Sequence, residues 1–392
     1  MYRMGQKEID EVKKVIESGD LFKINNGLKE SRQVEDKLKA IFGVDYPIFM
    51  TSGHAALTSA LIGLGIGPGD QVIVPAYTYI STAMAVVAAG AIPVIAEVDD
   101  TLTISAEDVE KKITKYTKAV MPVHIQGFPC NMDAIKAIAE KYNLYIVEDA
   151  CRADGGSYKG KRLGSIGDAG CFSFNYYKIV SSGEGGALIT NNHDLYQKAL
   201  IYHDSSAVAF FGDQTAGFTT PIFCGQEFRS NEICAAVMNM QLDRLDGILE
   251  DLRKNKKYLI DALSDVCKFV PSHDAEGDCG TMLAFQFDDA ETACKFAEAE
   301  SVTGYITLPI NTGKHIYKYW DCILEKRGAL HPLMDPFKME ANKDIIPDYS
   351  EDMCPDTLDK LSKAAYLNVK PDWTKEEMDE WVEKIKEAMK AI

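Results

Sequence analysis

The sequence predicts an α/β fold, with a mostly parallel sheet of about seven strands in a large domain and a smaller C-terminal α/β domain. The chain has 392 residues, which is more than one core usually fills. Short apolar runs alternate with helical patterns from about residue 46 to residue 191. A second α/β region begins near residue 268. We therefore expect a large domain over residues 1–250 and a small one over residues 251–392.

The expected strands are rich in Val and Ile and are bounded by Gly, Asp or Pro, as strands buried on both faces are. The seven runs are Ile48–Met50, Val72–Val74, Ile92–Ala96, Ala119–Val123, Leu144–Val147, Cys171–Phe174 and Ala187–Ile189. Helical patterns lie between several of them, for example over Met132–Tyr142. Because strands and helices alternate, the sheet is expected to be mostly parallel.

Beyond the last of these strands, apolar residues at helical spacing predict a helix over Asn231–Leu249. In the small domain, Leu283–Phe287 reads as a strand and Ala290–Ala299 as a helix. Asp348–Cys354 is expected to be a loop. The charged, amphipathic pattern of Thr374–Ile392 predicts a final helix. A helical segment is also expected before the first strand.

The composition excludes several classes of function. The formal net charge is -17, so nucleic acid and anionic membrane surfaces would be repelled. None of the 10 cysteines forms a Cys-x-x-Cys pair and no His pair has metal-ligand spacing, so no metal site is expected. Neither a signal peptide nor a membrane-spanning run is visible, and we expect a cytoplasmic protein with free thiols.

Two glycine-containing turns are candidates for a ligand site. Thr51-Ser52-Gly53-His54 follows the first strand and opens the apolar helix Ala55–Leu64. A turn of this kind presents main-chain N–H groups at a positive helix end, which suits a phosphate, although most such turns bind nothing. The turn Ser181–Gly186 carries three glycines, which permit sharp backbone close to a ligand or a neighbouring subunit.

The ends of two later strands carry the candidate chemistry. Ile146-Val147-Glu148-Asp149 ends in two carboxylates, and ligands of open α/β sheets bind beyond such ends. There Asp149 could keep a pyridinium nitrogen protonated, or serve as a helix cap or a metal ligand. The next run leads through Ser173, a potential phosphate donor, to Lys178. A lysine in a partly dry cleft has a lowered pKa and can form an imine with an aldehyde.

These motifs, with Phe-Ser-Phe before Lys178, Gly-Glu-Gly-Gly after it and Phe-Arg-Ser-Asn-Glu-Ile-Cys-Ala-Ala near residue 230, resemble the DegT/DnrJ/EryC1/StrS aminotransferases. These are fold-type I enzymes that use pyridoxal 5′-phosphate (PLP) and act mostly on keto sugars. The resemblance covers nearly the whole chain. The segments Gly155–Gly160 and Lys314–Trp320 are similar to a narrower branch, the 8-amino-3,8-dideoxyoctulosonate transaminases.

The resemblance implies roles for particular residues. Lys178 would be the Schiff-base lysine and proton shuttle, Asp149 would pair with the pyridine nitrogen, and Tyr79 would stack on the ring. The expected cofactor site comprises Gly53, His54, Ala55, Tyr79, Asp149, Arg152, Ser173, Lys178 and Glu227. The narrower resemblance adds His315 and Tyr317 as substrate contacts. The family resemblance also implies a homodimer with shared sites, and transfer from an amino acid, with glutamate as the expected donor, to a keto or aldehyde sugar such as an octulosonic acid or a nucleotide-linked sugar.

The sequence departs from the family pattern at three of these positions. His54 stands where the family has Thr, Arg152 where it has Gln, and Glu227 where it has an Asn that the partner subunit donates to the phosphate. A carboxylate would repel a phosphate, so we expect Glu227 to pair with His54 or Arg152. These departures keep other reactions open: a lyase or aldolase step, a sugar dehydratase, or a non-catalytic PLP-binding protein.

Three further features invite a functional interpretation. For His124 a satisfied loop histidine is preferred over a site residue. The polar segment Tyr202–Phe218, with His203 and Asp204, could be a substrate loop or an ordinary one. Arg229 is interpreted as structural.

Overall fold

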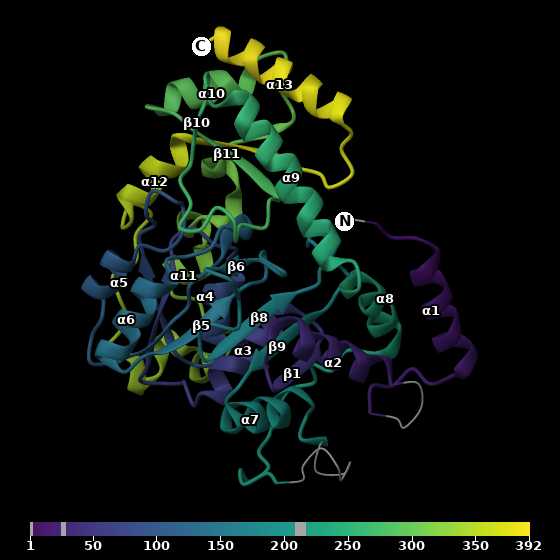
Figure 1. Cartoon of the computed structure of the whole chain (residues 1–392). Helices are drawn as coiled ribbons and strands as arrows, with labels where there is room; N and C mark the ends of the chain where they lie inside the picture. The colour runs from purple at the N-terminus through teal and green to yellow at the C-terminus, as the bar shows by residue number, and fades with distance from the viewer. Residues whose placement is uncertain (1–2, 25–28, 208–216) are drawn as a thin grey trace.

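The computed structural model of the chain describes residues 3–24, 29–207 and 217–392. Two sheets organise these residues (Figure 1). The larger sheet lies in the lower part of the view, between helices, and the smaller sheet lies above it. The long helix α9 (Leu245–Leu263) runs upward from the large domain to the small one.

The large sheet confirms the predicted strands and fold class. Within the described residues it has seven strands in the order β1-β9-β8-β5-β4-β2-β3. Only β9 runs against the others, because it pairs antiparallel with both β1 and β8 while the remaining pairs are parallel. The strands are β1 (Tyr46–Met50), β2 (Gln71–Pro75), β3 (Ile92–Ala96), β4 (Thr117–Val120), β5 (Tyr145–Asp149), β8 (Ala169–Ser173) and β9 (Gly186–Thr190).

Helices cover this sheet. The apolar α3 packs against α4, α7 and the sheet, which explains why it is hydrophobic all round. By contrast, α6 is amphipathic and confirms the helix predicted over the same residues. The covering helices are α3 (Gly53–Gly63), α4 (Ser81–Ala88), α5 (Ala106–Lys111), α6 (Met132–Tyr142) and α7 (His193–His203). A hairpin of β6 (Ser157–Tyr158) and β7 (Lys161–Arg162) lies between β5 and β8 in the sequence.

The helix predicted over Asn231–Leu249 is two helices, so that prediction was wrong in this respect. In the structure α8 (Glu232–Leu242) ends before α9 begins. The break contains Arg244, whose guanidinium contacts the buried carboxylate of Glu8 and the carbonyl oxygen of Arg3. This contact ties the break to α1 (Gln6–Ser18), which packs on α8 together with α2 (Glu30–Phe42).

The small sheet is antiparallel and has the order β10-β11-β13-β12. The predicted strand and helices of this region are present with boundary shifts of one or two residues, and residues 348–354 form the expected loop. Its strands are β10 (Lys268–Phe269), β11 (Met282–Gln286), β12 (Ile306–Thr307) and β13 (Ala364–Asn368). Its helices are α10 (Ala290–Glu298), α12 (Pro355–Ser362) and α13 (Lys375–Lys390).

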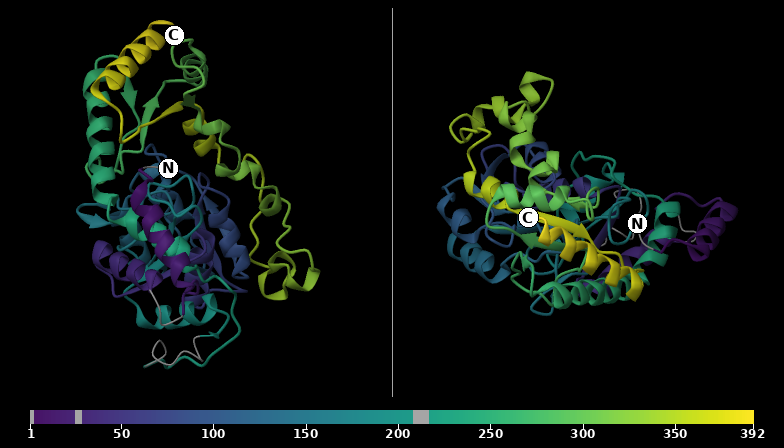
Figure 2. Two further views of the ribbon diagram at one scale, coloured as in Figure 1. Left: turned by 90° about the vertical axis from the view of Figure 1, so that its right-hand side faces the viewer. Right: turned by 90° about the horizontal axis from the view of Figure 1, so that it is seen from above.

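The connecting segment, which we define as residues 309–354, returns from the small sheet onto the large domain. It contains the short helix α11 (Asp321–Leu324), and Figure 2 (left) shows it lying alongside the large domain. Ile316 forms a bridge with Tyr77, and the Asn342 side chain bonds the main chain at Gly69 and Gly90. Residue 250 itself lies inside α9, and the division into 1–250 and 251–392 stays a prediction.

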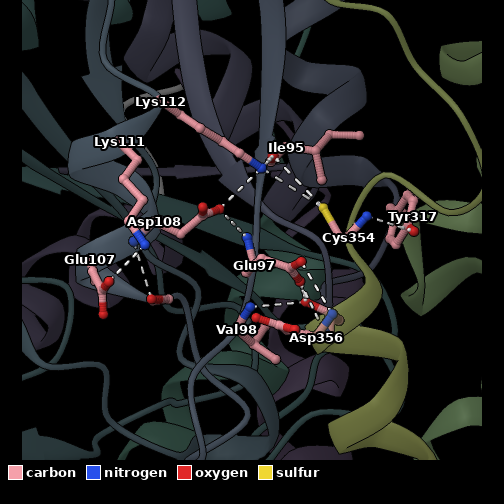
Figure 3. A network of polar contacts seen from close by, with 12 residues as sticks. Ile95, Glu97, Val98, Glu107, Asp108, Lys111, Lys112, Tyr317, Cys354 and Asp356 are labelled. Carbon is pink, nitrogen blue, oxygen red and sulfur yellow. Dashed lines mark hydrogen bonds and ion pairs between the residues drawn. The ribbon is translucent and has the colours of Figure 1, made fainter.

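A polar junction joins the end of the connecting segment to the large sheet (Figure 3). Glu97, just beyond β3, accepts hydrogen bonds from the main-chain N–H groups of Asp356 and Thr357 at 3.2 and 2.8 Å. These N–H groups belong to the first turn of α12 and have no partner within the helix. The large domain therefore caps a helix of the small domain.

Candidate active site

The end of β5 presents two neighbouring carboxylates to opposite faces of the sheet, as successive strand residues must. Glu148 is fully buried and accepts hydrogen bonds from three main-chain N–H groups at 2.6–2.8 Å, those of Gly164, Ile166 and Gly167. Its Oε2 also lies 3.1 Å from His124 Nε2. A carboxylate with this many donors holds the loop after β7 in place and is not available to a substrate.

The His124 ring is also fully engaged in hydrogen bonds within the protein. Its Nδ1 accepts a hydrogen bond from Cys130 N at 3.2 Å, so the proton sits on Nε2 and is donated to Glu148. Both ring nitrogens are used in this arrangement. This agrees with the interpretation of His124 as a satisfied loop histidine.

Asp149 points to the other face of the sheet, where two hydrogen bonds orient its carboxylate. Thr82 Oγ1 donates to its Oδ2 at 2.7 Å, and Cys151 N donates to its Oδ1 at 3.1 Å. Thr78 Oγ1 lies 2.8 Å from Thr82 Oγ1 and extends the chain of hydroxyls. The carboxylate is thus fixed in orientation at the carboxyl edge of the sheet, where ligands of open α/β sheets bind.

Lys178 follows β8 at the same edge. It lines a cavity of about 410 Å³ that is walled by both domains. Burial lowers the pKa of Lys178, and the nearby Arg152 lowers it further, while Cys151, Asp154 and Asp149 act in the opposite direction. A lowered pKa favours the neutral amine, which is the form that attacks a carbonyl. The cavity is lined by Gln126, Arg152, Tyr177, Lys178, Ile179, Thr281, Met282, His315 and Asn368.

The turn before α3 packs closely against the residues that follow β5 and end β8. Ser52 caps the helix by accepting from Ala55 N at 3.1 Å, and Gly53 and His54 begin it. A Cβ at Gly53 would lie 2.6 Å from Cys151 Sγ and 2.8 Å from Ser173 Cβ, so only glycine fits there. This packing brings the helix N-terminus against the end of β8, as a phosphate site at this turn requires. Burial lowers the pKa of His54, which favours its neutral form.

Two of the expected site residues meet at the mouth of the cavity. The Tyr79 ring is 51% exposed and lies 5.3 Å from the His315 ring, centroid to centroid. They are brought together because Thr78 N donates to His315 O at 2.9 Å, where the connecting segment lies along the end of β2. Burial lowers the pKa of His315 to about 4, with Arg152 and Lys178 adding to the effect, so its ring is neutral near pH 7.

Tyr317 does not join the cavity. Its ring is fully buried, and its hydroxyl donates to Glu351 O at 2.7 Å and accepts from Cys354 N at 3.0 Å. These contacts belong to the polar junction of Figure 3. The structure therefore places Tyr317 in a position that supports the fold, although the narrower resemblance had suggested a substrate contact.

Glu227 lies on an exposed segment within the chain. Its carboxylate forms an ion pair with Arg229 and accepts from Ser205 Oγ at 3.2 Å. Arg229 also donates to Asp204 O at 2.7 Å and lies over the Phe22 ring, in line with a structural role. The pairing of Glu227 with His54 or Arg152 stays a prediction.

The suggested substrate loop Tyr202–Phe218 is described only in part, because residues 208–216 lie outside the described residues. His203 is buried, and its Nδ1 lies 2.8 Å from Leu200 O. Burial lowers the pKa of His203 well below its usual range. A neutral, buried histidine at the end of α7 belongs to the packing of that helix.

Sequence reasoning missed several groups around the cavity. Thr82, Gln126, Asp154 and Asn368 carry no motif and stand among ordinary loop, helix and strand residues. Thr82 follows Tyr79 by three residues, the spacing of one helical turn, and this was the only available signal for it. The others come to the site through tertiary packing alone.

These residues fit PLP. The helix N-terminus at Gly53 presents main-chain N–H groups that suit a phosphate, Asp149 is fixed in orientation as a partner for a ring nitrogen requires, and Lys178 has a lowered pKa. Of the described residues, no helix is both long and apolar enough to cross a bilayer.

Comparison with known proteins identifies the family of this chain. The profile of the DegT/DnrJ/EryC1/StrS aminotransferase family matches residues 3–298. The spore coat polysaccharide biosynthesis protein SpsC of Bacillus subtilis is 31% identical over 378 residues, which cover 91% of this chain and 94% of that protein. The GDP-perosamine synthase of Caulobacter vibrioides is 42% identical over 205 residues, or 52% of this chain and 54% of that protein.

Solved structures give the same picture. An aminotransferase from Psychrobacter cryohalolentis superposes with a TM-score of 0.78 at 27% identity, covering 98% of this chain and 96% of that one. The family match spans both the turn at Gly53 and the Lys178 segment. The chain therefore belongs to the DegT/DnrJ/EryC1/StrS family and is a PLP-dependent aminotransferase.

Proposed function

We propose that the enzyme transfers an amino group from an amino acid, glutamate above all, to a keto or aldehyde sugar. The observation that carries the proposal is Lys178, a lysine of lowered pKa in a cavity at the same sheet edge as Asp149. The names of the relatives, a GDP-perosamine synthase and a spore coat polysaccharide protein, support a sugar acceptor. An octulosonic acid or a nucleotide-linked sugar is the acceptor class we favour.

Lys178 supplies both the attachment point and the proton transfer. With PLP in the site, Lys178 Nζ would hold the cofactor through its aldehyde group until a donor amine takes its place. The released Nζ accepts the proton from the α-carbon of the donor and returns a proton on the other side of the reaction. Its low pKa suits this work, since an amine that stayed charged could not accept a proton.

Asp149 acts through charge. When bound, PLP supplies an electron-withdrawing ring that stabilises negative charge at the carbon that has lost its proton. The Asp149 carboxylate, oriented by Thr82 and Cys151 N, keeps the ring nitrogen protonated and so maintains this capacity. The Tyr79 ring, next to the His315 ring, would cover the bound cofactor and exclude water.

A homodimer is part of the proposal. Ile9 and Ile16 on α1 are 59% and 60% exposed, and they share a shallow apolar surface with Val237 on α8. Tyr177, beside Lys178, is 76% exposed. A second copy that covers these side chains would also complete the active site. Sedimentation of Ile9→Glu/Ile16→Glu would show monomers if α1 forms the interface.

The decisive experiment follows the donor half-reaction. Glutamate added to the PLP-loaded protein should convert the cofactor absorbance from the aldehyde form to the pyridoxamine form. Borohydride should trap PLP on Lys178 before, but not after, that conversion. A PLP-binding protein without transaminase activity would leave the spectrum unchanged, and a protein that traps no PLP on Lys178 would refute the proposal.

A further inference from the structure

Arg152 stands out among the groups around the cavity because its charge is permanent. An arginine guanidinium does not lose its proton in proteins, and its planar fork of donors matches a carboxylate. Its Nη2 donates to Gln126 Oε1 at 2.6 Å, and both side chains line the cavity with Lys178 and His315. The guanidinium is therefore oriented by a neighbour beside the reactive lysine.

Gln126, which orients Arg152, has an unfavourable backbone conformation. Its φ of 54° and ψ of 17° are left-handed, which is uncommon for a residue with a side chain. The conformation is held from the small domain, since Thr281 Oγ1 donates to Gln126 O at 2.6 Å. Strain of this kind persists only where the surroundings impose it, and it gathers at ligand sites. Here it presents the Gln126 amide to Arg152.

Two buried tyrosine hydroxyls lie next to these residues. Tyr77 and Tyr366 are each 1% exposed, and neither hydroxyl makes a well-formed hydrogen bond with the described residues. The Arg152 charge acts on both phenols, and the Tyr77 hydroxyl faces Tyr366, Gln126 and Thr312. A buried hydroxyl without a partner costs free energy, so the pair is suited to an acceptor that enters the site.

Arg152 carries the permanent positive charge of this region. The pKa of His315 is about 4, so its ring is neutral near pH 7, and the pKa of Lys178 is lowered. Burial raises the pKa of Asp154 well above its usual range, which favours its uncharged form. Asp149 is engaged by Thr82 and Cys151 N. A positive centre in a dry cavity attracts an anionic group of the substrate strongly.

We propose that Arg152, oriented by Gln126 and assisted by the hydroxyls of Tyr77 and Tyr366, binds a carboxylate of the substrate. The inference rests on the proposed transamination and deepens it by naming the chemical group that is recognised. Two substrates could carry the carboxylate, the amino donor or an acidic sugar acceptor. A volume of about 410 Å³ is the size of a single small-molecule site, so the carboxylate is held in the same cavity as Lys178.

Calorimetry with an unreactive acid tests the subsite directly. Glutarate should bind the PLP-loaded wild type, and dimethyl glutarate, which lacks the charge, should bind far more weakly. Arg152→Gln should weaken glutarate binding by roughly 10- to 100-fold, since a charge-assisted bidentate contact is lost. Arg152→Lys keeps the charge without the fork, and it should fall between the two. Arg327→Gln, on the exposed partner of Glu325, is the matched control and should bind as the wild type.

The two hydroxyls are tested by Tyr77→Phe and Tyr366→Phe, which keep the rings in place. Each should weaken glutarate binding by about 3- to 10-fold, the effect of one hydrogen bond. If the phenols serve only the packing, both variants will bind glutarate as the wild type does and the hydroxyl part of the subsite is wrong.

The two half-reactions identify which substrate carries the carboxylate. If it belongs to the donor, Arg152→Gln raises the glutamate concentration needed to convert the cofactor. If it belongs to the acceptor, the pyridoxamine-loaded wild type prefers 5-ketogluconate to sorbose, which has a hydroxymethyl group in place of the carboxylate, and Arg152→Gln abolishes that preference. Either result supports the subsite.

Two results would overturn it. In the first, Arg152→Gln leaves glutarate binding and both half-reactions unchanged. In the second, the variant releases PLP while its affinity for glutarate is kept, which would assign Arg152 to the cofactor phosphate. Failure of the proposed function looks different, because glutarate would still bind through Arg152 while borohydride trapped no PLP on Lys178.

Discussion

The two faces of β5 treat their acidic residues in opposite ways. On one face, Glu148 accepts three main-chain hydrogen bonds and pairs with His124, with every contact inside the protein. On the other face, Asp149 opens toward Lys178, and the neighbouring Asp154 carboxyl is buried without a hydrogen-bond partner among the described residues. Glu148 thus belongs to a hydrogen-bond network that is closed within the protein, whereas Asp149, the next residue, lies among polar groups that border the cavity.

The difference separates groups that hold the fold from groups that await a substrate. A buried polar group is costly unless it is satisfied, so an incomplete set persists where function requires it. Glu97 in the polar junction of Figure 3 resembles Glu148, because its carboxylate accepts hydrogen bonds from main-chain N–H groups at the start of α12. Mutations on the Glu148 face of β5 should change the free energy of unfolding, and mutations on the face of Asp149 and Lys178 should change the rate of the reaction.

The largest effect is expected for Lys178→Ala. Loss of the amine removes both the attachment point and the proton carrier, so turnover should fall by at least about a thousandfold. The free energy of unfolding of the cofactor-free protein should change little, because the cost of burying the Lys178 amine offsets the contacts that its side chain makes. Steady-state kinetics and urea unfolding measure the two quantities. Near-normal turnover would contradict the assignment of the site.

Glu148→Ala should show the reverse pattern. Three main-chain N–H groups and His124 would lose their acceptor, and the free energy of unfolding should fall by roughly 3–5 kcal/mol. Urea unfolding measures this loss. Asp133→Ala, which removes an exposed carboxylate paired with Lys159, is the control and should change stability by less than about 1 kcal/mol. An unchanged stability in Glu148→Ala would break the contrast between the two faces.

Asp154→Asn should alter Lys178 without a large loss of stability. In the pH range where Asp154 is ionised, its charge raises the pKa of Lys178, so its removal should lower that pKa further. Arg152, Cys151 and Asp149 also face the lysine and are unchanged in the variant. The rate at which an amine-directed reagent acylates Lys178 in the cofactor-free protein, followed against pH by mass spectrometry, reports the neutral amine. An upward shift of that profile would show that Asp154 has another role.

The smallest effect is expected for His315→Gln. The pKa of His315 is about 4 in the folded protein and near 6.5 when unfolded, so between these values the unfolded state binds more protons. This group therefore contributes stability that is present above pH 6.5 and is lost as the pH falls toward 4. The variant should flatten that part of the stability profile in urea unfolding. An equally steep profile would mean that other groups, such as His203, dominate.

Features of the fold could be predicted from the sequence where they depend on residues close together in the chain. The seven strands, the amphipathic α6 and the final helix follow from short-range periodicity, and the structure confirms them. Lys178 and Asp149 were predicted because the carboxyl ends of parallel strands meet at one edge. The break between α8 and α9 was missed, and the residue in it, Arg244, contacts Glu8, which is far away in the chain.

The sequence by itself indicated the class of the molecule and a candidate reactive pair, Lys178 and Asp149, because each strand, the Gly53 turn and the Lys178 segment are written in a few consecutive residues. Only the tertiary structure decided the shape of the substrate cavity. Its walls come from Gln126, Arg152, Thr281, His315 and Asn368, which are spread over both domains and the connecting segment. No local pattern relates such residues, since they become neighbours only when the apolar faces of two separate sheets have been buried.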